Sequence, residues 1–235
     1  MERTEIIQIA LNAVGRGNYL EIGVSTGSSF IPLRAARKWG VDPDPYLSWK
    51  RILKYRLFSL LKIKDEGIFK ETSDAFFRHH AGMLQKAGID VAFVDGLHTS
   101  EQALDDVLNC LDYLKPGGVI LMHDCNPQSE TAAFRAASIE EVAAKSFPGW
   151  DGTWNGDVWR AVVHLRALHD DLNVFVLNCD NGVGVVRRGR PAEKLPYSKW
   201  EIQKMDYGFL AQNRQALLGL RPPEYIHDFL LRPAP

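Results

Sequence analysis

The sequence predicts an α/β protein built on a doubly wound, mostly parallel sheet of seven strands, with helices on both faces. Short apolar runs alternate five times with segments of helical spacing, which is typical of strand–helix–strand units with right-handed crossovers. The run at 90–95 is apolar at nearly every position, as expected of a strand that is covered on both faces. Near the end, Asp180-Asn181-Gly182 separates two apolar runs and predicts a β-hairpin, which would add antiparallel strands at one edge.

The individual elements follow from periodicity and from the residues that begin or end them. Gly15 ends the first helix, and the helix at 100–114 has an acidic first turn that suits the helix dipole before Pro116-Gly117-Gly118 ends it. We expect strands at residues 19–22, 41–42, 68–69, 90–95, 119–122, 173–177 and 182–186. We expect helices at residues 4–14, 28–38, 74–87, 100–114, 130–146, 157–168 and 197–231, the last interrupted by Pro222-Pro223.

Composition narrows the class of protein. The chain has 235 residues, 46% of them hydrophobic, and a formal net charge of −1, so it can bury a large core and carries no overall charge typical of a nucleic-acid binder. Three scattered cysteines form neither a disulfide framework nor a CxxC metal site, which favours a reducing cytoplasm. We expect no signal peptide, since the N-terminus has no basic start or small-residue cleavage site, and no transmembrane segment.

Two features allow alternative interpretations. The basic amphipathic stretch 46–64 could contact an acidic substrate or a membrane surface, or it could be the solvated side of an ordinary helix. Trp150, Trp154 and Trp159 could supply a stacking wall for a sugar or ring, or they could anchor a loop to the core.

The topology predicts where a ligand binds. In an open α/β sheet the ligand lies beyond the carboxyl ends of the strands, at the switch in strand order. The polar residues that follow four of the expected strands gather there: Glu21 to Gly27, Asp42, Asp95 to His98 and His123 to Asn126. The glycine-rich turn at 23–27 is placed to cradle a nucleotide-like ligand, unless it is only a tight connection. Asp42 is placed to accept hydrogen bonds from ribose hydroxyls, unless it is only a turn residue in Asp42-Pro-Asp-Pro.

Asp95 and Asp124 are the most informative pair. Both follow buried strands and should lie side by side, where two carboxylates repel unless a proton or a cation separates them. Mg²⁺ would suit the oxygen ligands, and His98 and His123 add nitrogen donors that also admit Mn²⁺ or another transition metal. The alternative is a hydrogen-bonded carboxylate pair without an ion. His98 could deprotonate an acceptor hydroxyl near neutral pH, and His123 could serve as a ligand or a base.

The motif series resembles that of class I S-adenosylmethionine-dependent methyltransferases, which have a Rossmann-like fold. It consists of LEIGVSTGSSF, GVDPDP, KETSDAFF and DVAFVDGLHTSEQALDDVLNCLDYLKPGGVILMHDCNP. The last stretch, with Asp-Gly-x-His and His-Asp-Cys-Asn-Pro, is similar to methyltransferase family 24, and so to metal-assisted O-methyltransferases of antibiotic and sugar tailoring. The resemblance covers about residues 18–127, and the hairpin at 173–186 fits the same fold. Such enzymes commonly have acids at both positions around 123–124, where this chain has His-Asp.

The resemblance implies a role for each site residue. Glu21, Gly23, Ser25 and Gly27 would line the methionine and ribose side of S-adenosylmethionine. Asp42 would hold the ribose diol, Ser73 or Asp74 would lie near the adenine, and Asp95 would adjoin the cofactor. Residues 1–190 would form the methyltransferase domain, with 191–235 as a helical extension packed on it or joining a homo-oligomer.

The expected reaction is methyl transfer to a hydroxyl of a small molecule such as a sugar, a phenol or a secondary-metabolite intermediate. Asp95, Asp124 and His123 would hold Mg²⁺ or Mn²⁺, with His98 as the base and Asp95 and His123 taking part in catalysis. Two alternatives share the same cofactor site: a metal-independent methyltransferase and a non-catalytic cofactor-binding or interaction module. A nucleotide-sugar or nicotinamide enzyme would need a different glycine pattern.

Overall fold

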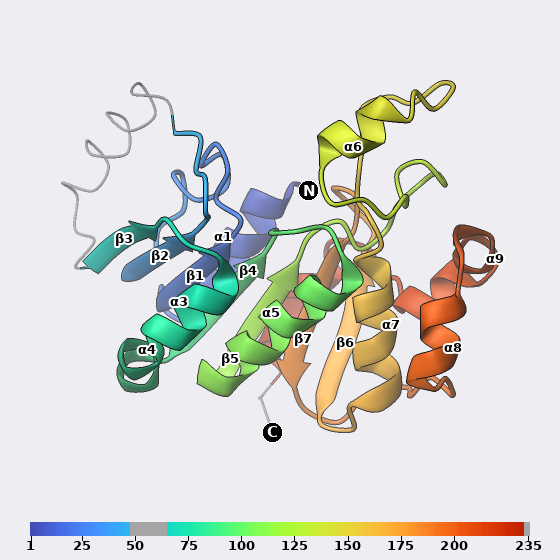
Figure 1. Cartoon of the computed structure of the whole chain (residues 1–235). Coiled ribbons are helices and arrows are strands. Elements are labelled where there is room, and N and C mark those ends of the chain that lie inside the picture. Colours follow the sequence, from blue (N-terminus) through green and yellow to red (C-terminus); the bar gives the residue numbers. More distant parts are fainter. Residues whose placement is uncertain (48–64, 233–235) are drawn as a thin grey trace.

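A computed structural model describes residues 1–47 and 65–232, which form a seven-stranded sheet in the order β3-β2-β1-β4-β5-β7-β6 (Figure 1). The strands are β1 (Asn18–Ile22), β2 (Arg37–Val41), β3 (Asp65–Phe69), β4 (Ile89–Val94), β5 (Leu114–Met122), β6 (Leu172–Leu177) and β7 (Val183–Arg188). The first five strands pair in parallel, whereas β7 runs antiparallel to both β5 and β6. The predicted fold class is therefore confirmed. The strand order reverses between β1 and β4, which is where such a sheet opens a ligand crevice.

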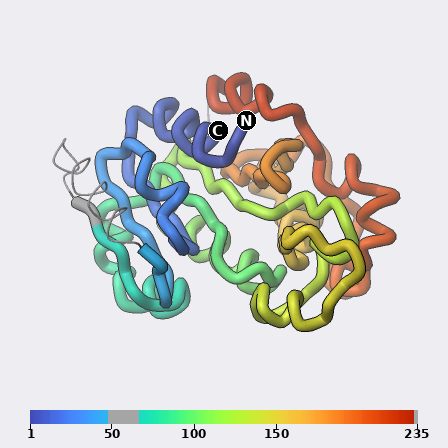
Figure 2. The backbone as a smooth tube through the Cα atoms, turned by 90° about the horizontal axis from the view of Figure 1, so that it is seen from above, coloured from blue at the N-terminus to red at the C-terminus, as the bar shows by residue number. Residues whose placement is uncertain are grey.

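Helices cover both faces of the sheet. They are α1 (Arg3–Ala13), α3 (Ser73–His79), α4 (Ala81–Ala87), α5 (Ser100–Tyr113), α6 (Ile139–Ala144), α7 (Trp159–Leu168), α8 (Lys199–Lys204), α9 (Tyr207–Leu218) and α10 (Tyr225–Leu231). One face packs on α3, α4, α5 and α7, with α8 and α9 beside α7, and the other packs on α1 and α10. Helices α1 and α10 pack against each other although they are far apart in sequence, and Figure 2 shows the blue N-terminal segment beside red helical segments.

Strand β4 shows why the central run is apolar throughout. Its side chains alternate between the two faces. Val91 and Phe93 enter the core beneath α1, whereas Ala92 and Val94 enter the core beneath α5. All four are at most 4% exposed, so each face of this strand needs apolar residues.

Several expected elements differ from the structure. The helix at 28–38 is wrong: residues 25–32 form turns, and Arg37 and Lys38 already belong to β2. Pro32 lies in the middle of that segment and lacks the N–H that a helix interior requires. The single helix at 74–87 is two helices that meet at His80.

Two further boundaries shift. Strand β5 starts at Leu114 and continues through Pro116-Gly117-Gly118, where the register with β4 shifts as in a β-bulge. The helix expected at 130–146 is reduced to α6, which begins after Ser138, whose hydroxyl caps it by accepting from the Glu141 N–H. Most of the basic stretch 46–64 lies outside the described residues.

Candidate active site

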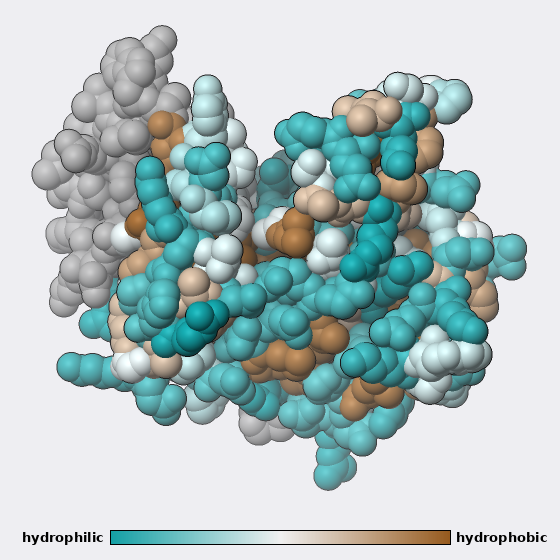
Figure 3. Space-filling model, viewed as in Figure 1, coloured by the Kyte–Doolittle hydropathy of each residue, from teal (hydrophilic) through white to brown (hydrophobic). Residues whose placement is uncertain are grey.

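A cavity of about 870 Å³ opens at the carboxyl ends of the parallel strands. In Figure 3 it appears as the notch between the lobe that carries the grey atoms and the lobe that carries α6. One wall consists of the turn after β1, the end of β2 and the start of α3, and the other of residues 95–98, 123–124 and 152–154. The volume falls within the range of ordinary ligand sites, about 300–1,000 Å³. The structure thus places the cavity where the strand order predicted a ligand.

The turn after β1 requires glycine at its first position. Gly23 has φ +87°, and a Cβ built there would lie 1.9 Å from the carbonyl oxygen of Asp95. The chain crosses the end of β4 so closely that only glycine fits. Two residues on, Ser25 has φ +46° and its backbone N–H donates to Oδ2 of Asp42 at 2.7 Å. The turn and the acid after β2 therefore form one hydrogen-bonded unit in the cavity wall.

A group of polar side chains lies at one end of the cavity. Ser73 and Asp74, at the start of α3, line it as the resemblance implied. The amide of Gln102 on α5 donates to both of them, at 3.3 and 3.2 Å, and to Oδ1 of Asp106 at 3.1 Å. Asp106 is 1% exposed, and burial raises its pKa to about 6. Gln102 and Asp106 were missed, although their spacing of four places them on one face of the expected helix 100–114.

Glu21 and Gly27 lie outside the cavity wall. The Glu21 carboxylate is fully buried, where it accepts hydrogen bonds from the hydroxyls of Tyr19 at 2.5 Å and Ser29 at 2.6 Å. Burial raises its pKa to about 7. A Cβ at Gly27 would meet the side chains of Leu47 and Ile31. The structure therefore places both residues beneath the turn, where they support it, rather than on its ligand side.

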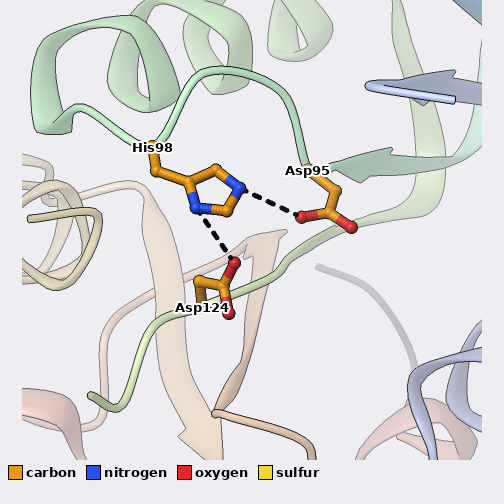
Figure 4. Close-up of side chains that lie close together, drawn as sticks. All are labelled: Asp95, His98 and Asp124. Carbon is orange, nitrogen blue, oxygen red and sulfur yellow. Dashed lines mark ion pairs between the residues drawn. The ribbon is translucent and has the colours of Figure 1, made fainter. Parts of the chain in front are cut away.

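Asp95, His98 and Asp124 converge at the other end of the cavity (Figure 4). His98 Nε2 lies 3.8 Å from Oδ1 of Asp95, and its Nδ1 lies 3.4 Å from Oδ2 of Asp124. One donor atom from each residue lies within 4.8 Å of the others, a spacing that could hold a metal ion. The strand order brings the three together because β4 and β5 are parallel neighbours.

Trp154 fixes the orientation of His98. Its indole stacks on the imidazole with ring centroids 4.7 Å apart, and its carbonyl oxygen lies 3.0 Å from Nδ1 of His98. A carbonyl only accepts, so this contact keeps the proton of the neutral imidazole on Nδ1 and leaves the lone pair on Nε2. Nε2 faces Asp95. Of the three tryptophans considered, Trp154 lines the cavity, Trp159 lies in the core and Trp150 donates to the Thr153 carbonyl within its loop.

His123 lies between the two carboxylates, beside the three-residue cluster. Its Nδ1 lies 3.3 Å from Asp95 and 3.2 Å from Asp124, and its Nε2 lies 3.3 Å from Oδ1 of Asp180, which also pairs with Arg3 at 3.1 Å. Burial alone would lower the pKa of His123, but the carboxylates raise it to about 12. The surrounding carboxylates therefore favour the protonated form of His123, although Nη1 of Arg3 also lies 3.2 Å from its Nε2. The three-residue cluster contains His98 in its place.

The Asp124 carboxylate is held in an unusual backbone conformation. Asp124 is 4% exposed and has φ +58°. Burial would raise the pKa of its carboxyl, but the hydrogen bond and the charge of His123 lower it, so the group stays ionised. The side-chain N–H of Asn155 donates to Oδ1 of Asp124 at 2.5 Å. The amide oxygen of Asn155 is buried and has no partner among the described residues. The Asn155 oxygen is thus a buried acceptor without a hydrogen-bond donor among the described residues, beside an ionised carboxylate.

Other expectations concern residues away from the cavity. Helices α8 and α9 pack on α7, and α10 packs on α1, while no described residue after Asn181 lines the cavity. The tail therefore does not cover the site. Among the described helices, none is both long and apolar enough to cross a membrane.

The comparisons with known proteins agree with this geometry. Residues 20–125 match the family model Methyltransf_24, a methyltransferase domain. None of the curated proteins compared with the sequence matches it. Among solved structures, cofactor-bound Rv0187 from MTB is 16% identical with a TM-score of 0.52, over 81% of this chain and 82% of that one.

Two further solved structures share the fold. A putative O-methyltransferase from Klebsiella pneumoniae is 14% identical with a TM-score of 0.52, over 80% of this chain and 81% of that one. An O-methyltransferase from Bacillus cereus, solved with SAH, is 18% identical with a TM-score of 0.50, over 80% and 82%. Residues 20–125 thus match a methyltransferase domain, and the chain shares the fold of these solved structures.

Proposed function

We propose that the protein methylates a hydroxyl of a small molecule, with a divalent metal ion and a histidine base assisting. The observation that carries this is a single cavity whose polar end at Asp42, Ser73 and Asp74 continues into the Asp95–His98–Asp124 cluster. Such an arrangement can hold a nucleoside-bearing cofactor and an acceptor beside each other. Proximity of this kind supplies much of the rate of a group transfer.

The cofactor end would be formed by the turn after β1 and by residues of α3 and α5. Asp42 would accept from the ribose hydroxyls, since each carboxylate oxygen keeps a lone pair beyond its bond to the backbone N–H of Ser25 or Asp44. Gln102 and Asp106 would add polar contacts near the adenine. S-adenosylmethionine supplies the reactive methyl group when bound.

The metal ligands would be the carboxylates of Asp95 and Asp124. Carboxylate oxygens suit Mg²⁺ or Mn²⁺, and Oδ1 of Asn155, which has no partner among the described residues, offers one more oxygen close by. A bound divalent ion would lower the pKa of an acceptor hydroxyl. His98 is left out of this set because it is the proposed base, and His123 because its ring nitrogens already contact Asp95, Asp124 and Asp180.

The proton of the acceptor would pass to Nε2 of His98, directly or through water. In the neutral imidazole the Trp154 carbonyl favours the proton on Nδ1, which leaves a lone pair on Nε2, and the indole stacks on the ring. Asp95 faces the same nitrogen at 3.8 Å and would stabilise the imidazolium that forms.

Titration of S-adenosylhomocysteine into the protein by calorimetry, with and without Mg²⁺, tests the cofactor site first. We expect micromolar binding, and absence of binding in both conditions would contradict the proposal. Asp44→Asn serves as a matched control for Asp42→Asn, since Asp44 is exposed in the same loop.

The base and the metal are tested by turnover. Replacing His98 with Gln should reduce kcat by about 10²–10⁴ if His98 is the base, and a loss below about tenfold would count against that role. Excess chelator should abolish turnover, with recovery on adding Mg²⁺ or Mn²⁺. Undiminished turnover in chelator would instead support the metal-independent reaction, which is favoured by one observation: the His123 cation can balance Asp95 and Asp124 without an ion.

A further inference from the structure

A second cavity, of about 490 Å³, lies at the edge of the sheet formed by β6 and β7, beneath α9 and α10. It has no lining residue in common with the active-site cavity. Its wall is rich in arginines, which are Arg166, Arg187, Arg188, Arg190, Arg221 and Arg232. Among the described residues that line it, the single acid is Glu193. In a chain with a net charge of −1, such a concentration of positive charge around one cavity calls for an explanation.

Arg187 is one of two buried arginines in this wall that lack a full set of partners. It is 7% exposed, and Nη1 donates to the carbonyls of Phe229 at 3.2 Å and Arg232 at 3.1 Å, while Nε is buried without an acceptor. No carboxylate among residues 1–47 and 65–232 pairs with it. Burial lowers its pKa accordingly. A buried charge with no counterion is costly, and an anion would offset that cost.

Arg166 shows the same pattern on the opposite wall. It is 5% exposed, and Nη1 donates to the carbonyls of Ala216 and Leu217 near the end of α9. Its nearest carboxylate is Glu193, at 3.8 Å and on a side chain that is 70% exposed, while Nε is buried without an acceptor. Gly219 has φ +58°, and a Cβ there would lie 2.9 Å from Cζ of Arg166. Capping of helix ends accounts for Nη1 of both arginines but for no other guanidinium nitrogen.

The remaining arginines lie at the rim. Arg190, Arg221 and Arg232 are exposed, and none forms an ion pair with a described residue. Arg221 and Arg232 lie against the ring of Tyr225, at 5.4 and 5.5 Å from its centroid. Their guanidinium groups are therefore held near the cavity mouth instead of being free in solvent. Arg188 differs, because it pairs with Asp171 at 3.2 Å.

We propose that this cavity binds a small molecule through a multiply charged phosphate group. Guanidinium forks match the geometry of phosphate oxygens and form paired, charge-assisted hydrogen bonds with them. A monoanion would offset few of the charges that converge here, whereas a phosphate or diphosphate would offset more of them. The concave shape and the volume suit a small ligand rather than a polymer. This inference is independent of the reaction in the active-site cavity.

Calorimetry with the whole protein in a phosphate-free buffer tests the proposal, with inorganic pyrophosphate as the probe. We expect saturable binding and a matching rise in Tm. Arg187→Gln and Arg221→Gln should each weaken binding by about tenfold or more, because each removes a charged fork. Arg221 is exposed, so that variant should fold even if Arg187→Gln does not. Arg78→Gln, an exposed arginine of α3 far from this cavity, should bind pyrophosphate as the unaltered protein does.

Two further arms identify the source of the phosphate. Inorganic phosphate and ADP are titrated in parallel. Tighter binding of ADP than of pyrophosphate would indicate a nucleotide that also contacts the aromatic rings. Equal binding of the two would indicate recognition of the phosphates alone. No binding of any probe up to about 5 mM, the range of very weak affinity, would overturn the proposal. Equal weakening in Arg221→Gln and Arg78→Gln would overturn it too, since it would show attraction to overall charge and not to this cavity.

Discussion

Replacing Glu21 with Gln should change how the stability of the protein depends on pH. The Glu21 carboxyl is fully buried, and burial raises its pKa from 4.5 to about 7. The folded state then holds this proton more tightly than the unfolded state does. The stabilisation is complete below the unfolded pKa and is lost as pH rises through the folded one. From these two values we expect the unaltered protein to lose about 2 to 3 kcal/mol between pH 5 and pH 8 through this group.

Urea denaturation at pH 5, 6, 7 and 8 measures this loss. The amide in the Glu21→Gln variant would not titrate, so the difference in unfolding free energy between the two proteins should change by that amount across the series, in favour of the variant at pH 8. Asp106→Asn serves for comparison, because burial raises the pKa of Asp106 to about 6. The contribution of Asp106 to the unfolding free energy should therefore be lost at lower pH than that of Glu21. A constant difference between Glu21→Gln and the unaltered protein at all four pH values would refute the reasoning. If the Glu21→Gln variant lost S-adenosylhomocysteine binding while its stability stayed unchanged, Glu21 would instead contact the ligand.

Three further predictions concern the active-site cavity. Gly23→Ala should lower Tm sharply or prevent folding, because the new Cβ would lie 1.9 Å from the Asp95 carbonyl oxygen. Gly15→Ala is the control: Gly15 has φ +71° with nothing within 4 Å of its Cβ position, so this change should cost only about 1 kcal/mol of unfolding free energy. Similar melting curves for the two variants would contradict this prediction. Asp42→Asn should weaken S-adenosylhomocysteine binding by about tenfold or more in calorimetry, as loss of a charged acceptor predicts, and equal affinity in Asp42→Asn and Asp44→Asn would argue against a ribose contact. Trp154→Ala should lower kcat more than it changes KM, because the indole stacks on the His98 ring with centroids 4.7 Å apart. Trp154→Phe should recover much of the lost kcat. A Phe variant no better than the Ala variant would rule out ring stacking as the cause.

The fold could be predicted because its signals are local in sequence. Apolar runs, glycine-rich turns and the Asp180-Asn181-Gly182 hairpin each depend on neighbouring residues, and the structure confirms seven strands in a mostly parallel sheet. Where local signals conflict, the prediction failed. In 28–38 the helical spacing of apolar residues was given more weight than Pro32, and the segment forms turns.

Part of the site could be predicted for a related reason. Parallel strands end at the same edge of a sheet, so residues that follow β4 and β5 must lie near each other. Asp95, His98 and Asp124 lie together in the structure accordingly. The resemblance placed Glu21 on the cofactor side of the turn, whereas the structure buries it outside the cavity wall.

The sheet, the position of its ligand crevice and the acids that end its central strands could be predicted from the sequence. Which groups surround those acids depends on the tertiary structure. Trp154 orients His98 from 56 residues away, and Asp180 reaches His123 from 57 residues away. Such contacts depend on how loops pack across the sheet, and no periodicity records them. The same holds for the arginine-lined cavity, whose wall comes from β6, β7 and three helices that meet only when the chain has folded.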